Sequence, residues 1–275
     1  MSQALVKTPY TPPEERGLAW GVIHWWRNFV GVWPLVLLLI AGVLLTPIPF
    51  VVSPDNLGKK VGYGMFRVWS RWLLRGFGVR VWVKGLEHAV ADGRYVAVSN
   101  HRSHLDVPAL GVTLPMHMVT VHKRELEYVP FLGQALWMSR SIGLDRSDKA
   151  GAQRRLMLVA QRLRVGRSVM IFPEGRRSRG PRLDPFKKGA FLIAIEQQCP
   201  MLPVTIVGTD ALYAPGKVMV RRGDVLVTVH PPIQTAGLAM ADRDALIRRV
   251  HDVVNGAFVA GPVSASMLEG ATRLV

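Results

Sequence analysis

From about residue 79 to residue 260, short apolar runs alternate with segments of helical periodicity. The apolar runs are rich in β-branched residues and predict β-strands. They cover residues 80–83, 95–99, 117–121, 168–172, 204–207 and 225–229. The periodic segments predict α-helices. They cover residues 106–114, 149–165, 189–197 and 241–259. This alternation is typical of an α/β domain with a central, mostly parallel or mixed sheet flanked by helices.

The N-terminal part of the chain has a different pattern, which predicts association with a membrane. No charged residue lies between Phe29 and Val52, and this length is sufficient to cross a hydrocarbon layer of ~30 Å at ~1.5 Å per residue. The run begins too late and is too long for a cleavable signal peptide. Prolines within it leave two alternatives open, a transmembrane span and a pair of helices in one leaflet.

Residues 61–79 predict a basic amphipathic helix. Tryptophans and other apolar residues recur there at helical spacing, and arginines recur every four residues on another face. This composition is typical of an interfacial membrane helix and equally of a surface helix packed on a catalytic domain, and the two are compatible. Four parts of the chain follow from these patterns. They are a polar tail (1–17), membrane-embedded and interfacial helices (18–78), an α/β domain (79–260) and a loosely held C-terminal tail (261–275).

The chain is strongly basic, yet apolar on average. Its 35 Lys and Arg residues against 19 Asp and Glu give a net charge of +16, while the mean hydropathy is +0.20. Charge beside an apolar segment fits an anionic membrane surface better than nucleic acid, for which the sequence has no binding motif. A single cysteine, Cys199, excludes an intrachain disulfide. The sequence contains no cluster of metal-binding residue types at ligand spacing, so it predicts no structural metal.

Candidate chemistry begins where the second predicted strand ends, at Asn100 and His101, with Asp106 five residues after the histidine. Pro108 is a helix-start signal, so Asp106 is predicted to be an N-cap. If the loop folds back, the carboxylate can bind one imidazole nitrogen and leave the other to take a proton from a hydroxyl. The alternative is a simple cap beside an ordinary loop histidine. His104 is a second candidate proton carrier, and we favour His101.

A second candidate site follows the strand predicted at residues 168–172. Glu174 and Gly175 turn the chain there, and glycine lets the backbone come close to a ligand. A dense group of cations comes next, and its position after a strand favours an anion site over a general basic patch. The group comprises Arg176, Arg177, Arg179, Arg182, Lys187 and Lys188. Lys188 also precedes a helix start, where backbone N–H groups favour phosphate. Arg146, earlier in the chain, is a further candidate phosphate ligand, with a solvated ion pair to Asp145 as the alternative.

Taken together, these segments resemble the glycerolipid acyltransferases, and in particular the bacterial 1-acylglycerol-3-phosphate O-acyltransferases. The resemblance extends over about residues 79–230. The family's motifs match four segments in the same order, and the first and third, N-H-x-x-x-x-D and F-P-E-G-T-R-S, are specific. The segments are residues 100–106, 143–146, 172–178 and 203–206. In the third motif Arg176 stands where threonine is usual.

The resemblance implies transfer of a fatty-acyl group from an acyl thioester, of acyl carrier protein or coenzyme A, to the free hydroxyl of lysophosphatidic acid, giving phosphatidic acid in phospholipid biosynthesis. His101, polarised by Asp106, is the implied general base. The implied substrate-binding residues are Asn100, Arg146, Glu174, Gly175, Arg176, Arg177, Ser178 and Lys188. No metal or resident cofactor is implied, and the implied partners are the bilayer, the lysophospholipid and the thioester, not nucleic acid. The implied location is the bacterial inner membrane, with the active site on the cytoplasmic face.

Other functions remain open from the sequence. The same chemistry on lyso-ornithine lipid or another lysophospholipid is one, because the Arg176 substitution lies in the acceptor motif. A lipid hydrolase lacks support, since no G-x-S-x-G nucleophile elbow is present. A basic membrane lipid-binding protein is the non-enzyme alternative, and it would have no need of the His101–Asp106 pair.

Overall fold

The fold is taken from a computed structural model of the chain, which describes residues 57–91, 93–128, 141–144, 152–164, 167–213 and 219–275. The polar tail, the uncharged run Phe29–Val52 and the candidate ligand Arg146 all lie outside these residues. Within the described ranges, no helix is long and apolar enough to cross a membrane.

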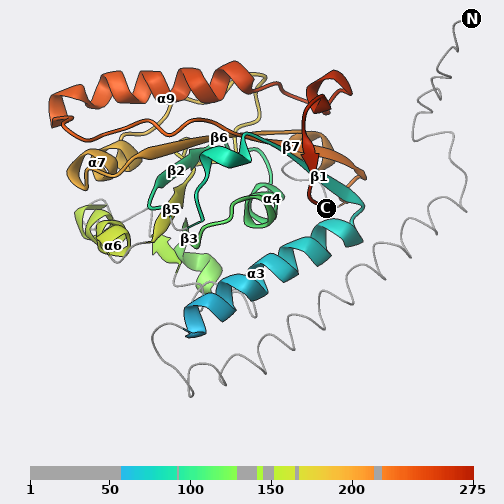
Figure 1. Cartoon of the computed structure of the whole chain (residues 1–275), viewed down its shortest axis with the longest axis horizontal. Coiled ribbons are helices and arrows are strands. Elements are labelled where there is room, and N and C mark those ends of the chain that lie inside the picture. Colours follow the sequence, from blue (N-terminus) through green and yellow to red (C-terminus); the bar gives the residue numbers. More distant parts are fainter. Residues whose placement is uncertain (1–56, 92, 129–140, 145–151, 165–166, 214–218) are drawn as a thin grey trace, which may run out of the picture.

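An eight-stranded mixed sheet forms the centre of the domain, in the order β4-β3-β5-β2-β6-β7-β1-β8 (Figure 1). The strands are β1 (Val79–Lys84), β2 (Val96–Ser99), β3 (Met118–Lys123), β4 (Ile142–Leu144), β5 (Ser168–Ile171), β6 (Met201–Val207), β7 (Gly223–Val229) and β8 (Thr272–Arg273). Two pairs, β6–β7 and β1–β8, are antiparallel, and the other neighbours are parallel. The predicted α/β fold with a mixed central sheet is therefore confirmed. The short strands β4 and β8 were not predicted.

Several strands converge on one edge of this sheet, which we call the motif edge. Strands β2, β5 and β6 are parallel, so their C-terminal ends at Ser99, Ile171 and Val207 lie together there. Strand β7 runs antiparallel to β6, and Val79 at the start of β1 pairs with Gly223 at the start of β7. The starts of β1 and β7 therefore reach the motif edge too.

Helices cover both faces of the sheet (Figure 1). They are α3 (Leu57–Gly76), α4 (Asp106–Thr113), α6 (Ala152–Arg164), α7 (Gly189–Glu196), α8 (Thr209–Leu212) and α9 (Arg243–Ala257), with short 3-10 turns at Leu86–His88, Arg124–Tyr128, Met240–Asp242 and Ser266–Leu268. Helices α3 and α4 pack on one face, and α6, α7 and α9 pack on the other. Side chains along β2 point alternately to the two faces of the sheet. Ala97 joins the hydrophobic core beneath α3 and α4, whereas Val96 and Val98 join the core beneath α6, α7 and α9.

Helix α3 packs on α4 with a face that differs from the predicted apolar one. Leu74 and Ser70 are fully buried, whereas Val68 and Trp72 are 47% and 52% exposed. The reason is close contact between the two helices: a Cβ at Gly111 of α4 would lie only 3.1 Å from Ser70 Oγ. Glycine at position 111 lets Phe66 and Ser70 of α3 approach α4 closely, and two apolar side chains of α3 remain on the surface.

The last residues of the chain are held more firmly than expected. Thr272 and Arg273 pair with β1, and the Leu274 N–H donates to the Val81 carbonyl oxygen over 2.8 Å. Val275 is buried at 7% exposure. These residues extend the sheet beyond β1 and do not form the loose tail that the composition suggested.

Candidate active site

His101 lies at the motif edge, two residues after β2 ends. Its Nδ1 is 2.7 Å from Asp106 Oδ2, and its ring stacks on Phe172 with centroids 4.1 Å apart. The His101 side chain is 20% exposed while that of Asp106 is inaccessible. Because Asp106 binds Nδ1, Nε2 is the nitrogen left to face a substrate hydroxyl. The structure thus brings together the histidine and the carboxylate that the sequence paired.

Asp106 shapes the loop that carries His101. Its Oδ2 also accepts the backbone N–H groups of Arg102 and Ser103, at 2.7 and 2.8 Å. Its Oδ1 accepts from Thr209 Oγ1 at 2.6 Å. The predicted N-cap role is wrong, because Asp106 is the first residue of α4 and its carboxylate turns back to the preceding loop. One buried carboxylate therefore joins the His101 ring, the following loop and Thr209.

Asn100 fixes the end of β2 to β6. Its Nδ2 donates to the Ile206 carbonyl oxygen, and its Oδ1 accepts from the Ile206 N–H, both over 2.8 Å. The side chain is fully buried. The structure therefore places Asn100 as a link between strands that positions the following histidine, and away from a surface that a substrate could reach.

Glu174 joins the two motif loops. Its Oε1 accepts the His101 N–H at 2.7 Å and its Oε2 accepts the Asp184 N–H at 3.1 Å. It is 2% exposed. Gly175, next to it, has φ +73°, and a Cβ there would lie 2.6 Å from Lys187 Nζ. Glycine is favoured at this position by the positive φ.

A buried arginine, Arg102, ties the same loops to α8. It donates to Ser178 Oγ at 3.0 Å and to Asp210 Oδ2 at 3.0 Å, and it is 3% exposed. The Ser178 N–H in turn donates to the His101 carbonyl oxygen over 3.0 Å. Sequence reasoning missed Arg102, Asp210 and Thr209. A signal for two of them was available, because Thr209 and Asp210 follow shortly after the fourth motif. That motif lies on β6, which ends at the motif edge.

The remaining predicted cations lie nearer the surface. Arg176 forms an ion pair of 2.9 Å with Asp184 and is 74% exposed, so it is directed to a surface carboxylate. Arg177 is partly exposed and donates to His104 Nε2. Lys188 is exposed at the start of α7. The structure therefore brings Arg177 beside the His101 loop.

Acidification is expected to destabilise the protein through His104. Burial, followed by the Arg177 guanidinium, lowers the pKa of His104 below its ordinary 6.5. The unfolded chain therefore takes up this proton at a higher pH than the folded one, so the stability from neutral His104 is present above 6.5 and is lost as the pH falls below it. Between pH 7.5 and pH 5.5, the midpoint of urea unfolding should fall by a smaller amount in His104→Gln than in the wild type. Equal losses would contradict this role.

Comparison with known proteins decides the family. The sequence model of the Acyltransferase family matches residues 80–207, which include both motif loops. A putative 1-acyl-sn-glycerol-3-phosphate acyltransferase of Caenorhabditis elegans is 30% identical over 239 residues, which are 86% of this chain and 83% of that protein. The chain belongs to this acyltransferase family. The family and the enzyme class that the sequence motifs predicted are thereby confirmed.

Other acyltransferases support the assignment. The 1-acyl-sn-glycerol-3-phosphate acyltransferase of Limnanthes douglasii is 32% identical over 77% of this chain and 73% of its own length. The alpha enzyme of Homo sapiens is 36% identical over 64% of this chain, and the match spans 62% of the human protein. The crystal structure of the acyltransferase PlsC from Thermotoga maritima has a TM-score of 0.67, with 84% of this chain and 95% of that chain covered. At 23% identity this last likeness confirms the fold.

Proposed function

We propose that this acyltransferase moves a fatty-acyl group from a thioester to the free hydroxyl of lysophosphatidic acid and so forms phosphatidic acid. The observation that carries the proposal is the 2.7 Å contact between His101 Nδ1 and buried Asp106, with Nε2 left for the acceptor. Arg177 beside the same loop supplies a cation for an acidic acceptor. The names of the relatives, which are acyltransferases acting on 1-acyl-sn-glycerol 3-phosphate, agree with this acceptor.

The chemistry needs one base and no covalent enzyme intermediate. His101 Nε2 takes the hydroxyl proton as the acceptor oxygen attacks the thioester carbonyl carbon. The tetrahedral intermediate then expels the thiolate, which takes the proton back from Nε2, so one ester and one thiol replace one thioester and one alcohol. Asp106 stabilises the transient imidazolium. General-base catalysis of this kind is worth ~10²–10⁴ in rate, and orientation of the two substrates supplies more.

The basic side chains around the loops would hold the acceptor phosphate. We assign this role to Arg177 and Lys188, together with Arg146 outside the described residues. Glu174 and Gly175 act by fixing the loop, since the carboxylate is buried between two backbone N–H groups. The donor in this proposal is an acyl thioester of acyl carrier protein or coenzyme A, and the reaction uses no metal or resident cofactor.

We place the enzyme at the cytoplasmic face of a bacterial inner membrane. The net charge of +16 supports contact with anionic lipid. The exposed Trp72 and Val68 of α3 support insertion of this helix into the interface. Residues 18–78 would then hold the catalytic domain where its lipid acceptor and product reside.

A panel of acceptors tests the proposal. The purified chain in liposomes would receive labelled acyl-carrier-protein or coenzyme A thioester, with lysophosphatidate, lyso-ornithine lipid or monoacylglycerol as acceptor. We expect lysophosphatidate to be used at least ~10²-fold more efficiently than monoacylglycerol, because a site built for a polar group rejects an analogue that lacks it. Preference for lyso-ornithine lipid would overturn the acceptor assignment. No transfer from either donor would favour a lipid-binding protein.

Arg177→Ala is expected to weaken acceptor use more than turnover. Loss of a charged hydrogen bond to phosphate costs ~1.5–3 kcal/mol, which corresponds to a rise of about 10–10²-fold in KM for lysophosphatidate. The KM for the thioester and kcat should change much less. Arg94→Ala removes the same charge from an exposed position before β2, at the opposite edge of the sheet, and serves as the control. An unchanged KM for lysophosphatidate in the Arg177 variant would rule out the phosphate contact.

A further inference from the structure

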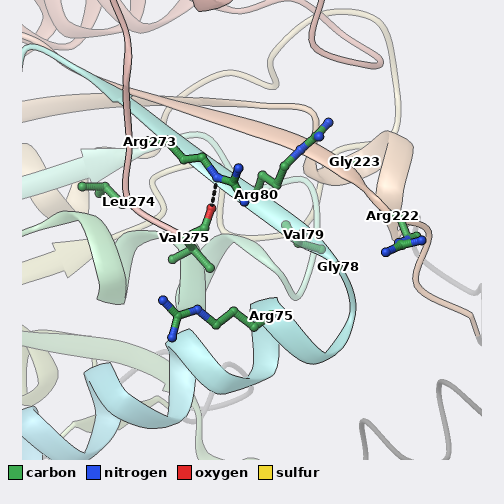
Figure 2. A pocket seen from close by; sticks show the side chains of 9 residues that line it. All are labelled: Arg75, Gly78, Val79, Arg80, Arg222, Gly223, Arg273, Leu274 and Val275. Carbon is green, nitrogen blue, oxygen red and sulfur yellow. Dashed lines mark hydrogen bonds between the residues drawn. The ribbon is translucent and has the colours of Figure 1, made fainter.

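An open cleft of about 720 Å³ lies at the end of α3, away from His101, and arginines from four separate segments line it. Figure 2 shows Arg75 on the last turn of α3, Arg80 on β1, Arg222 before β7 and Arg273 on β8. Arg75 and Arg80 are five residues apart, whereas Arg222 and Arg273 come from distant parts of the sequence. All four residues line one open hollow, which none of the sequence motifs reaches, and Figure 2 shows Arg75 and Arg222 on opposite sides of it.

Two of the four arginines, Arg80 and Arg273, already have an oxygen partner in the chain. Arg80 is neutralised by Asp224, to which it donates twice, at 2.8 and 2.6 Å. In the described part of the chain, no Asp or Glu side chain lies within ion-pair distance of Arg75, Arg222 or Arg273. Arg273 uses Nε to donate to the Val275 oxygen at 2.8 Å, which leaves its other N–H groups for a ligand.

The exposed side chain of Arg222 lies against the backbone of Gly78 at the cleft. Gly78 has φ +67°, and a Cβ there would lie 2.8 Å from Arg222 Nε. The arginine therefore passes close to the backbone of Gly78, where the positive φ favours glycine. The Gly223 N–H also donates to the Gly78 carbonyl oxygen over 3.3 Å, which joins the two segments.

The cleft shares the motif edge with His101. It opens where β1 and β7 begin, and β1 is the third strand from β2 in the sheet. At ~4.8 Å per strand, the separation across the sheet is roughly 14 Å. A planar surface that contacts this edge can therefore reach both places at once.

A stripe of α3 connects the cleft to an apolar surface. Val68, Trp72 and Arg75 follow one another at spacings of four and three residues, so they share a face of the helix. Val68 and Trp72 are about half exposed. An exposed tryptophan one turn from a cationic cleft is typical of a protein surface that sits at the level of lipid headgroups.

We propose that this cleft binds the phosphate group of an anionic bilayer phospholipid while Trp72 enters the interface beside it. Arg75, Arg222 and Arg273 supply the planar, multidentate donors that a phosphate prefers. The site is separate from the proposed acceptor site at Arg177, which follows β5 on the other side of β2. Its role is to hold the motif edge against the membrane surface, and its occupancy does not depend on acyl transfer.

Binding of the full chain to vesicles tests the proposal without any turnover. Partitioning would be measured into phosphatidylcholine vesicles with 0 or 30 mol% phosphatidylglycerol, at ionic strength near 0.15 M. Each arginine at an anionic surface contributes about fivefold in affinity. The triple variant Arg75→Gln, Arg222→Gln, Arg273→Gln should therefore lose on the order of 10²-fold on anionic vesicles and little on neutral ones.

A matched triple variant separates the cleft from general charge. Exposed arginines elsewhere on the domain can be neutralised so that the net charge falls by the same amount. They are Arg94, Arg164 and Arg249. This control should lose less than about threefold on anionic vesicles, since its positions do not face the proposed membrane surface. Equal losses in both triple variants, or no loss in the cleft variant, would overturn the proposal.

Two further comparisons identify the occupant. Replacing the three cleft arginines by lysine keeps the charge but loses the planar fork, so its affinity for anionic vesicles should lie between those of the wild type and the glutamine variant. The donor's phosphates or an acidic carrier protein are the other candidate occupants. If the glutamine variant bound anionic vesicles normally but had a raised KM for the thioester in neutral detergent micelles, the cleft would serve the donor and the lipid assignment would be wrong.

Discussion

Replacing His101 with alanine is expected to lower kcat for acyl transfer by about 10²–10⁴-fold, because general-base help of this size is lost with the imidazole. The ring lies partly exposed against Phe172, so its removal leaves a small surface gap and the fold should persist. Lipid binding should also persist, because the acceptor phosphate is assigned to other side chains, Arg177 and Lys188. The measurement is steady-state release of free thiol at saturating lysophosphatidate.

A second histidine provides the control for this variant. His88 follows β1 at the opposite edge of the sheet from His101. His88→Ala should therefore keep kcat within about twofold, as surface changes away from a site usually do. If His101→Ala also kept its rate, the proton would have to pass to another group, and His104 would be the first candidate.

Asp106→Asn is expected to have the second-largest effect, again lowering kcat by about 10²–10⁴-fold. Asparagine preserves the shape of the side chain but removes the negative charge that stabilises the imidazolium formed during transfer. The same charge strengthens the hydrogen bonds from Arg102 and Ser103. We therefore expect the free energy of unfolding to fall as well, by about 1–3 kcal/mol. Rate and urea unfolding would be measured on the same preparation.

Thr209→Val separates the charge of Asp106 from its packing. This change removes only the bond of 2.6 Å to Asp106 Oδ1 and leaves the contact of Oδ2 with His101 intact. It should therefore lower kcat by no more than about tenfold, because the charge that faces the imidazole is retained. A loss equal to that of Asp106→Asn would show that position, and not charge, is what Asp106 contributes.

The sequence predicted the parts of the fold and site that depend on local pattern. Buried strands stand out as short runs of β-branched residues, and a loop after a parallel strand lies at the edge where sites gather. His101 and Asp106 are five residues apart, so one loop can close the contact between them. Their pairing required no knowledge of distant segments, and the structure shows it directly.

What the sequence did not predict depends on contacts between distant segments. Thr209 reaches Asp106 across 103 positions because β6 lies beside β2. Strands of three and two residues, β4 and β8, are too short for any periodicity and form against neighbours already in place. The buried face of α3 follows from the close approach of Ser70 to Gly111, a steric condition that hydrophobicity does not report.

Formation of phosphatidate by the purified wild type and His101→Ala, side by side in the same liposomes with a labelled acyl thioester, tests the central claim most directly. We predict labelled phosphatidate from the wild type, with one thiol released for each ester formed and no label retained on the protein after acid quenching. His101→Ala should form almost none. Phosphatidate formation by the variant at more than about a tenth of the wild-type rate, above the expected range for loss of a base, would contradict the assignment of His101.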